Sequence, residues 1–443
     1  MSKFIKIAAT TVAAAAALTS LTACSSGSDK AADDEGSVYY LSFKPEQDQI
    51  WQDVAKAYTE ETGVEVKVVT AASGTYEQTL KSEVAKSDAP TLFQINGPVG
   101  LKNWIDYTAD LSETDFYKNL LDPSLAVTKD GKVFGVPYVV EGYGIIYNQK
   151  IMDKYFALGG AKVKSMDEIT NFDTLKAVAD DMQAKKGELG IEGVFASTSL
   201  KPGEDWRWQT HLADLPVYFE YQDAKVEDSD ELKFTYNEQF KNIFDLYLTD
   251  STIDPKLASS KAVTDSMAEF ALGKAAMVQN GNWAFGQISE VAGNTVAAED
   301  VKMLPIYTGH KGEEKQGLNI GTENYFSINS QASEADQKAS IDFVNWLVSS
   351  EKGKKLMVED LGFIPPFNTF TDAEQPSDPL AQEIVRYMSD SEKKSIPWVF
   401  TTFPSQTFKE DFGAALSQYA AGQMEWNKVV EIFTTEWKAE KGA

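Results

Sequence analysis

The sequence predicts an α/β protein in which two lobes share one chain. Residues 38–43 form an apolar run typical of a buried strand, and Val64, Val66 and Val68 alternate with polar residues as in a second strand. Between them lies a helical stripe of apolar residues that ends at Thr62-Gly63. A strand, a helix and a strand in this order make a βαβ unit, whose two strands pair in parallel.

The same alternation continues along the chain. A helix is expected around Tyr76, Leu80 and Val84, and a strand at 91–95. Further helices are expected at 172–182 (capped by Asn171), 240–247, 341–347 (capped by Ser333), 408–419 and 426–433, and further strands at 194–196 and 275–278. Because no linker-like segment interrupts the pattern, we expect two α/β lobes, with a ligand cleft beyond the carboxyl ends of their strands.

The N-terminus predicts export. Lys3 and Lys6 precede an uncharged stretch at 7–18, which is too short to span a bilayer, and Leu21-Thr22-Ala23 then precedes Cys24. Cys24 is the only cysteine in the chain, and its position resembles that of the lipidated cysteine in a bacterial lipobox. We expect a signal peptide at 1–23, a diacylglycerol anchor on Cys24 and a flexible, polar tether at 24–37. The alternative is ordinary cleavage near Ala23 beside an incidental cysteine.

Composition narrows the possible partners. The chain has 443 residues with 67 acidic and 41 basic side chains, and a net charge of −26. Such a surface disfavours nucleic acids, which bind through Lys and Arg at their phosphates. With only two histidines and no Cys/His cluster, neither a metal site nor a cofactor is expected.

Three segments together carry a family resemblance. Residues 131–138 lead into 140–148, residues 270–277 lead into Asn280-Gly281-Asn282-Trp283, and residues 343–347 precede 362–365. In this order they resemble extracellular solute-binding proteins of family 1, the maltose-binding-protein-like type, over residues 38–437.

The resemblance implies a type II periplasmic-binding-protein-like fold, each lobe a sheet flanked by helices. It places residues 38–139 and 325–366 in an N-terminal lobe, and residues 140–324 and 367–443 in a C-terminal lobe. The chain would cross between the lobes near 138–143 and 322–324. It further implies a monomeric, non-enzymatic lipoprotein on the outer face of the bacterial cell membrane, which delivers an oligosaccharide to an ABC permease.

Some site residues follow from the resemblance. Glu141 matches a carboxylate that contacts sugar hydroxyls, with a hinge hydrogen-bonding role as the alternative. Trp283 matches a stacking tryptophan, with simple burial as the alternative, and 205–208 match a segment that supplies an aromatic platform. The later platform is not aligned: Trp398 is a candidate, and Lys409 falls near the aligned position.

The physics of sugar binding supports the same kind of site. A sugar ring has an apolar C–H face, on which aromatic rings stack, and a rim of hydroxyls, which pair with carboxylates, amides and Arg. The expected ligand-binding residues are Lys44, Tyr76, Asn96, Glu141, Tyr143, Trp206, Arg207, Trp283, Glu323, Asn324 and Trp398.

Two other functions stay open. The many acidic residues would also suit a receptor for a polyamine or another small polar solute. A secreted glycoside hydrolase needs only two suitably spaced carboxylates, which 67 acidic residues could supply by chance. The order of the three segments favours a receptor over a hydrolase, but the sequence does not identify the sugar.

Overall fold

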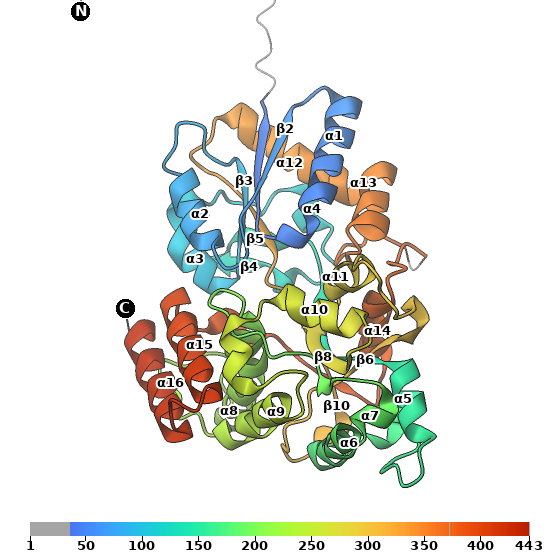
Figure 1. Ribbon diagram of the computed structural model, residues 1–443. Coiled ribbons are helices and arrows are strands. Elements are labelled where there is room, and N and C mark those ends of the chain that lie inside the picture. Colours follow the sequence, from blue (N-terminus) through green and yellow to red (C-terminus); the bar gives the residue numbers. More distant parts are fainter. Residues whose placement is uncertain (1–35, 372, 443) are drawn as a thin grey trace, which may run out of the picture. The chain divides into compact units, whose positions relative to one another are not determined.

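The computed structural model describes residues 36–371 and 373–442, which contain two β-sheets with helices packed on them (Figure 1). The predicted signal peptide, Cys24 and the tether up to residue 35 lie outside the described residues. In the described ranges, no helix has the length and apolar character needed to cross a bilayer.

The first sheet has the strand order β2-β1-β3-β11-β5-β4. Its strands are β1 (Val38–Ser42), β2 (Val66–Thr70), β3 (Leu92–Ile95), β4 (Val127–Lys129), β5 (Lys132–Pro137) and β11 (Tyr325–Ile328). β1 pairs in parallel with β2 and β3, as the βαβ pattern predicts, whereas β11 and β4 pair antiparallel to their neighbours.

Helices cover both faces of this sheet. One core contains Tyr40, Trp51, Phe326 and Phe343, and joins the sheet to α1 (Asp48–Thr62), α4 (Asp115–Lys118), α12 (Glu334–Ser349) and the segment after α13 (Glu351–Lys355). The other face packs on α2 (Tyr76–Glu83) and α3 (Pro98–Trp104). The helix α1 ends as predicted, because Gly63 takes the left-handed conformation at φ +81°.

The second sheet has the order β12-β10-β6-β8-β7, with β9 also paired to β6. Its strands are β6 (Glu141–Asn148), β7 (Gly193–Phe195), β8 (Ala275–Gly281), β9 (Val301–Leu304), β10 (Gln316–Gly321) and β12 (Lys394–Ile396). The central strand β6 is antiparallel to β8, β9 and β10, and only the outer pairs β7–β8 and β10–β12 are parallel. This sheet is therefore mixed, and not a simple series of βαβ units.

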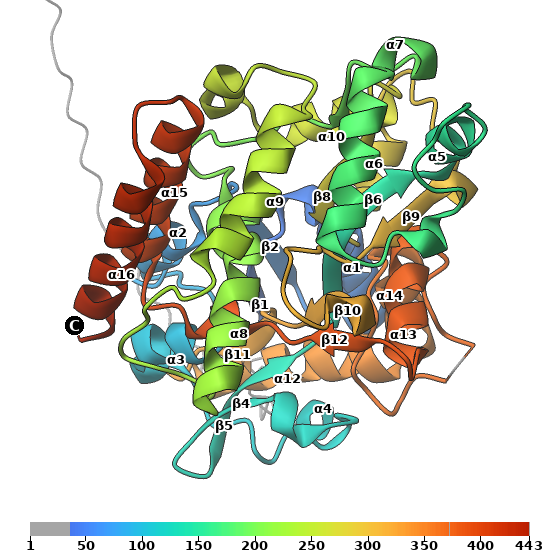
Figure 2. The ribbon, with the colours of Figure 1, turned by 90° about the horizontal axis from the view of Figure 1, so that it is seen from below.

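We call the first sheet with its helices the first half of the molecule, and the second sheet with its helices the second half. The helices of the second half form two groups. One face of the sheet packs on α10 (Val263–Ala271), α11 (Ala284–Ser289) and α14 (Pro379–Ser389). The larger core on the other side includes α5 (Gln149–Phe156), α6 (Phe172–Ala184), α7 (Lys186–Leu189), α8 (Ala213–Ala224), α9 (Asn237–Thr249), α15 (Gln406–Ala420) and α16 (Trp426–Lys441). Figure 2 shows α15 and α16 side by side next to α8 and α9.

Short segments connect the two sheets. Residues 138–140 run from β5 to β6, and residues 322–324 run from β10 to β11. A third connection leads to α14. Phe367 and Phe370 still pack on the core of the first sheet.

Candidate functional site

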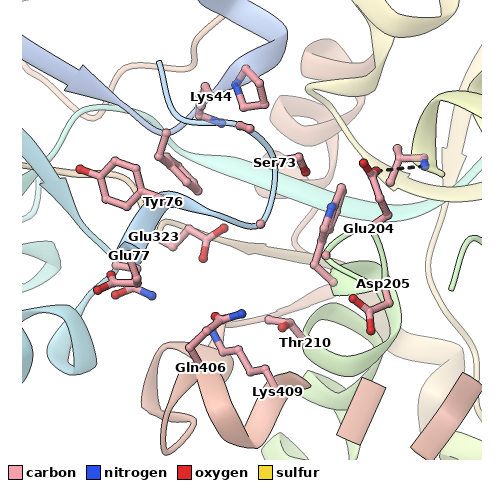
Figure 3. Close-up of a pocket in the computed structure, with 18 of the residues that line it drawn as sticks. Lys44, Ser73, Tyr76, Glu77, Glu204, Asp205, Thr210, Glu323, Gln406 and Lys409 are labelled. Carbon is pink, nitrogen blue, oxygen red and sulfur yellow. Dashed lines mark hydrogen bonds between the residues drawn. The ribbon is translucent and has the colours of Figure 1, made fainter. Parts of the chain in front are cut away.

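A cavity of about 520 Å³ lies at the carboxyl ends of β1, β2 and β3 (Figure 3). Phe43, Ala72 and Asn96 follow these strands and line the cavity, as expected for an open α/β sheet. The opposite wall comes from the second half, through the segment 203–211, the start of α10, Trp283 and α15. The volume falls in the range of small-molecule sites, about 300–1,000 Å³.

Two indole rings form the aromatic wall of this cavity. The ring centroids of Trp206 and Trp283 are 6.0 Å apart, and both side chains are partly exposed. The ring of Trp283 lies against the backbone of Gly281, at the end of β8, where a Cβ atom would come within 2.2 Å of the ring. Gly281 therefore leaves the space that the indole occupies.

A buried aromatic layer supports these rings. The ring of His211 stacks on that of Tyr143, with centroids 4.3 Å apart, and the Tyr143 hydroxyl donates to the carbonyl oxygen of His211 at 2.9 Å. Trp398 packs against Gly321 and lies 6.3 Å from Trp283 between ring centroids. Burial holds the pKa of His211 well below its usual range, so its imidazole is neutral.

A buried ion pair lies where the first connection meets the cavity. Lys44 Nζ donates to Glu141 Oε1 at 2.7 Å, and Asn324 Nδ2 donates to Glu141 Oε2 at 2.6 Å. Burial opposes the charge of Lys44, but Glu141 and Glu46 outweigh it and raise the pKa of the ammonium group. Lys44 and Asn324 already donate to both oxygens of Glu141. Glu141 therefore links the connection at 138–140 to the connection at 322–324, in addition to lining the cavity.

Carboxyl groups and a second lysine form another wall (Figure 3). Burial raises the pKa of Glu77 and of Glu323, and it lowers the pKa of Lys409. Burial also raises the pKa of Asp205, to about 6. All four groups line the cavity, and shifted titratable groups gathered in a cleft mark it as a candidate functional site.

Seven of the predicted residues line the cavity: Lys44, Tyr76, Asn96, Glu141, Trp206, Trp283 and Glu323. The hydroxyl of Tyr76 is already engaged, since it donates to the carbonyl oxygen of Gln94 at 2.9 Å and accepts from its N–H at 2.8 Å. The side-chain oxygen of Asn96 is buried and has no hydrogen-bond partner among the described residues.

Four predicted residues lie behind the wall and not on it: Tyr143, Arg207, Asn324 and Trp398. Arg207 shows the reason most clearly. Its guanidinium turns into the core, where it donates to the carbonyl oxygen of Gln279 at 2.7 Å, to Ser266 Oγ at 2.9 Å and to Ser199 Oγ. With its donors directed there, Arg207 holds the π-helical segment Arg207–Leu212 against β8.

Several residues that line the cavity were not predicted from the sequence. They include Glu46, Glu77, Gln78, Glu204, Gln209, Thr210, His211, Gln287, Gln406 and Glu410. Glu77 and Gln78 follow the predicted residue Tyr76 directly, so proximity to Tyr76 was the available signal for them. Gln406 and Glu410 lie near Lys409, which also lines the cavity and which the sequence placed only near the aligned position of the later platform.

The comparisons with known proteins agree on one family. Residues 53–383 match the family described as bacterial extracellular solute-binding protein. Over 117 residues, 26% of this chain, the sequence is 32% identical to the melibiose/raffinose/stachyose-binding protein MelE of Bacillus subtilis (strain 168), but the match spans only 25% of that relative. A maltotriose-binding protein of Pyrococcus abyssi (strain GE5 / Orsay) is 23% identical over 77% of this chain and 69% of its own length.

Solved structures share the fold. A chitin oligosaccharide binding protein superposes with a TM-score of 0.73 over 93% of this chain and 100% of its own, at 18% identity. The binding protein RafE in complex with raffinose superposes with a TM-score of 0.70 over 91% of this chain and 99% of its own, also at 18% identity. The predicted two-lobed α/β fold is thereby confirmed. Because the family match covers most of its length, this chain belongs to the bacterial extracellular solute-binding proteins.

Proposed function

We propose that this protein captures an oligosaccharide outside the cytoplasm and delivers it to the permease of an ABC importer. The observation that carries the proposal is the pair of indoles, Trp206 and Trp283, on the wall of a cavity that is also lined by carboxyl, amide and amine groups. Indole rings suit the C–H faces of sugars, and the polar groups suit their hydroxyls. The proteins named above as binding melibiose, raffinose and stachyose, maltotriose, or chitin oligosaccharides support the same class of ligand.

A thermal-shift panel tests this function. We expect at least one of raffinose, stachyose, maltotriose and chitotriose to raise the melting temperature, because a ligand at 100 times its Kd adds about 2.7 kcal/mol to the native state. Spermidine and buffer without any ligand serve as comparisons. A shift with spermidine, and with none of the sugars, would contradict the proposal.

A receptor for a polyamine or another small cation is the second candidate, for one reason. Carboxylic side chains outnumber lysines on the cavity wall: Glu46, Glu77, Glu141, Glu204, Asp205, Glu323 and Glu410 face only Lys44 and Lys409. The ion pair of Lys44 with Glu141 takes one group from each side and leaves this excess unchanged. The two indole rings favour the sugar, although aromatic rings also attract cations.

We propose that the protein acts as a monomeric receptor without catalysis, and that ligand closes its two lobes about residues 138–140 and 322–324. Closure around a ligand in a cleft is a common hinge motion, and a ligand drives it only by better contacts in the closed form. Incubation with chromogenic glycosides should release no chromophore. Turnover that persists after repurification would favour the hydrolase.

We also propose that Cys24 carries the membrane anchor, on the evidence of its sequence context. Cys24→Ala is expected to move the protein out of the membrane fraction, or to leave its signal peptide uncleaved, because no thiol remains to be alkylated. Fractionation and intact mass check this. A variant with the fractionation and mass of the wild type would show that Cys24 is incidental.

A further inference from the structure

Two loops from opposite halves touch at a pair of glycines. Gly74 follows β2 of the first sheet, and Gly203 lies between β7 of the second sheet and the segment Arg207–Leu212. A Cβ atom on Gly74 would lie 2.8 Å from the carbonyl oxygen of Gly203 and 3.0 Å from its Cα. Backbone atoms cannot rotate away as the end of a side chain can, so the loops approach this closely only while residue 74 is glycine.

This contact lies on the rim of the cavity, since both glycines line it. A second close approach bridges the same two halves. Gly97 follows β3, and a Cβ atom there would lie 3.1 Å from Cβ of Thr401 in the segment Val399–Thr402. The first half thus meets the second at glycines that follow two of its parallel strands, β2 and β3.

The contact between the loops is asymmetric. A Cβ atom on Gly203 would meet nothing within 4 Å, whereas one on Gly74 would meet the backbone of the opposite loop. Both glycines have a positive φ, +70° for Gly74 and +80° for Gly203. Alanine would therefore cause similar local strain at either position, but only at position 74 would it also push the halves apart.

We propose that Gly74 sets how far the two halves can close over the cavity, and that any side chain at this position holds them open. Gly74 is then a positioning residue: it acts on ligand binding through the distance between the halves and needs no contact of its own with the ligand. This role rests on the proposed closure of the two lobes, and it is the same whichever sugar is bound.

A cross-linking experiment tests the proposal without ligand. In the full chain carrying Cys24→Ser, Ser73→Cys and Pro202→Cys place thiols on the two loops, next to the contacting glycines. The rate at which a short bis-maleimide joins them reports how often the loops meet. Adding Gly74→Ala should lower this rate about tenfold, and adding Gly203→Ala should leave it within twofold. Equal rates for the two variants would overturn the proposal.

Two further measurements complete the test. The melting temperatures of Gly74→Ala and Gly203→Ala should fall by the same small amount. Equal falls show that both variants fold and that backbone strain does not explain their different cross-linking rates. Titration calorimetry with the sugar that gives the largest shift in the panel should show about tenfold weaker binding for Gly74→Ala, because closure is then harder. Gly131→Ala should leave binding unchanged, since Gly131 also has a positive φ but does not line the cavity. If no sugar binds, the proposed function fails, while the cross-linking rates still decide the role of Gly74.

Discussion

Replacing Trp283 with alanine is expected to weaken binding of the preferred sugar by about 2–4 kcal/mol, the range for a truncated central anchor. This corresponds to roughly a 30-fold to several hundred-fold rise in Kd. Trp283 is partly exposed on the cavity wall, and its ring is held against Gly281 and near Trp206. Titration calorimetry on the folded variant measures the effect.

Two further variants separate stacking from general damage. Trp346→Ala removes another partly exposed tryptophan, which lies on α12 and does not line the cavity, so the affinity should be unchanged. Gly281→Ala keeps the indole but displaces it, since the new Cβ would lie 2.2 Å from the ring, and it should also weaken binding. If Trp283→Ala binds within twofold of the wild type, the indole only fills the wall.

Local signals in the sequence predicted where α6 and α12 begin. The side chain of Asn171 accepts from the N–H of Thr174 at 2.9 Å, and the side chain of Ser333 accepts from the N–H of Asp336 at 3.1 Å, so both helices begin where predicted. Such caps depend on residues within one turn of the helix. The same holds for the glycine that ends α1.

Pairing in the second sheet could not be predicted in this way. The strand β6 pairs with β8, β9 and β10, which lie far along the chain, and register such as Glu141 opposite Gly321 depends on packing between them. The alternation of strands and helices predicted parallel pairing, which describes β1, β2 and β3 well and the centre of the second sheet poorly.

The sequence predicted which types of residue form the site better than it predicted the direction in which each side chain points. Trp206 and Arg207 are neighbours in one short segment, but Trp206 faces the cavity while Arg207 is fully buried behind it. Glu77 and Lys409 are polar residues beside the apolar stripes of α2 and α15, a position that predicts exposure to solvent. In the structure both line the cavity, because the opposite half lies over them. Which polar face meets a cavity is a property of the packed halves.

Replacing Lys44 with methionine is expected to lower the free energy of unfolding by about 3–5 kcal/mol, because it leaves the charge of Glu141 buried without its cation. The side chains of Lys44 and Glu141 are 6% and 4% exposed, and their Nζ and Oε1 atoms are 2.7 Å apart. Asn324 alone cannot neutralise the carboxylate, although it still donates a hydrogen bond to it. Urea unfolding, followed by tryptophan fluorescence, gives the change.

A surface pair of the same length provides the control. Lys176 and Asp180 are also 2.7 Å apart but are 50% and 51% exposed, so Lys176→Met should cost only about 0.3–0.5 kcal/mol. Adding Glu141→Gln to Lys44→Met removes the buried charge and should recover roughly half of the loss, because the two residues are energetically coupled. Equal losses for Lys44→Met and Lys176→Met would mean that water from the cavity solvates Glu141, and that the ion pair does not stabilise the connection between the two sheets.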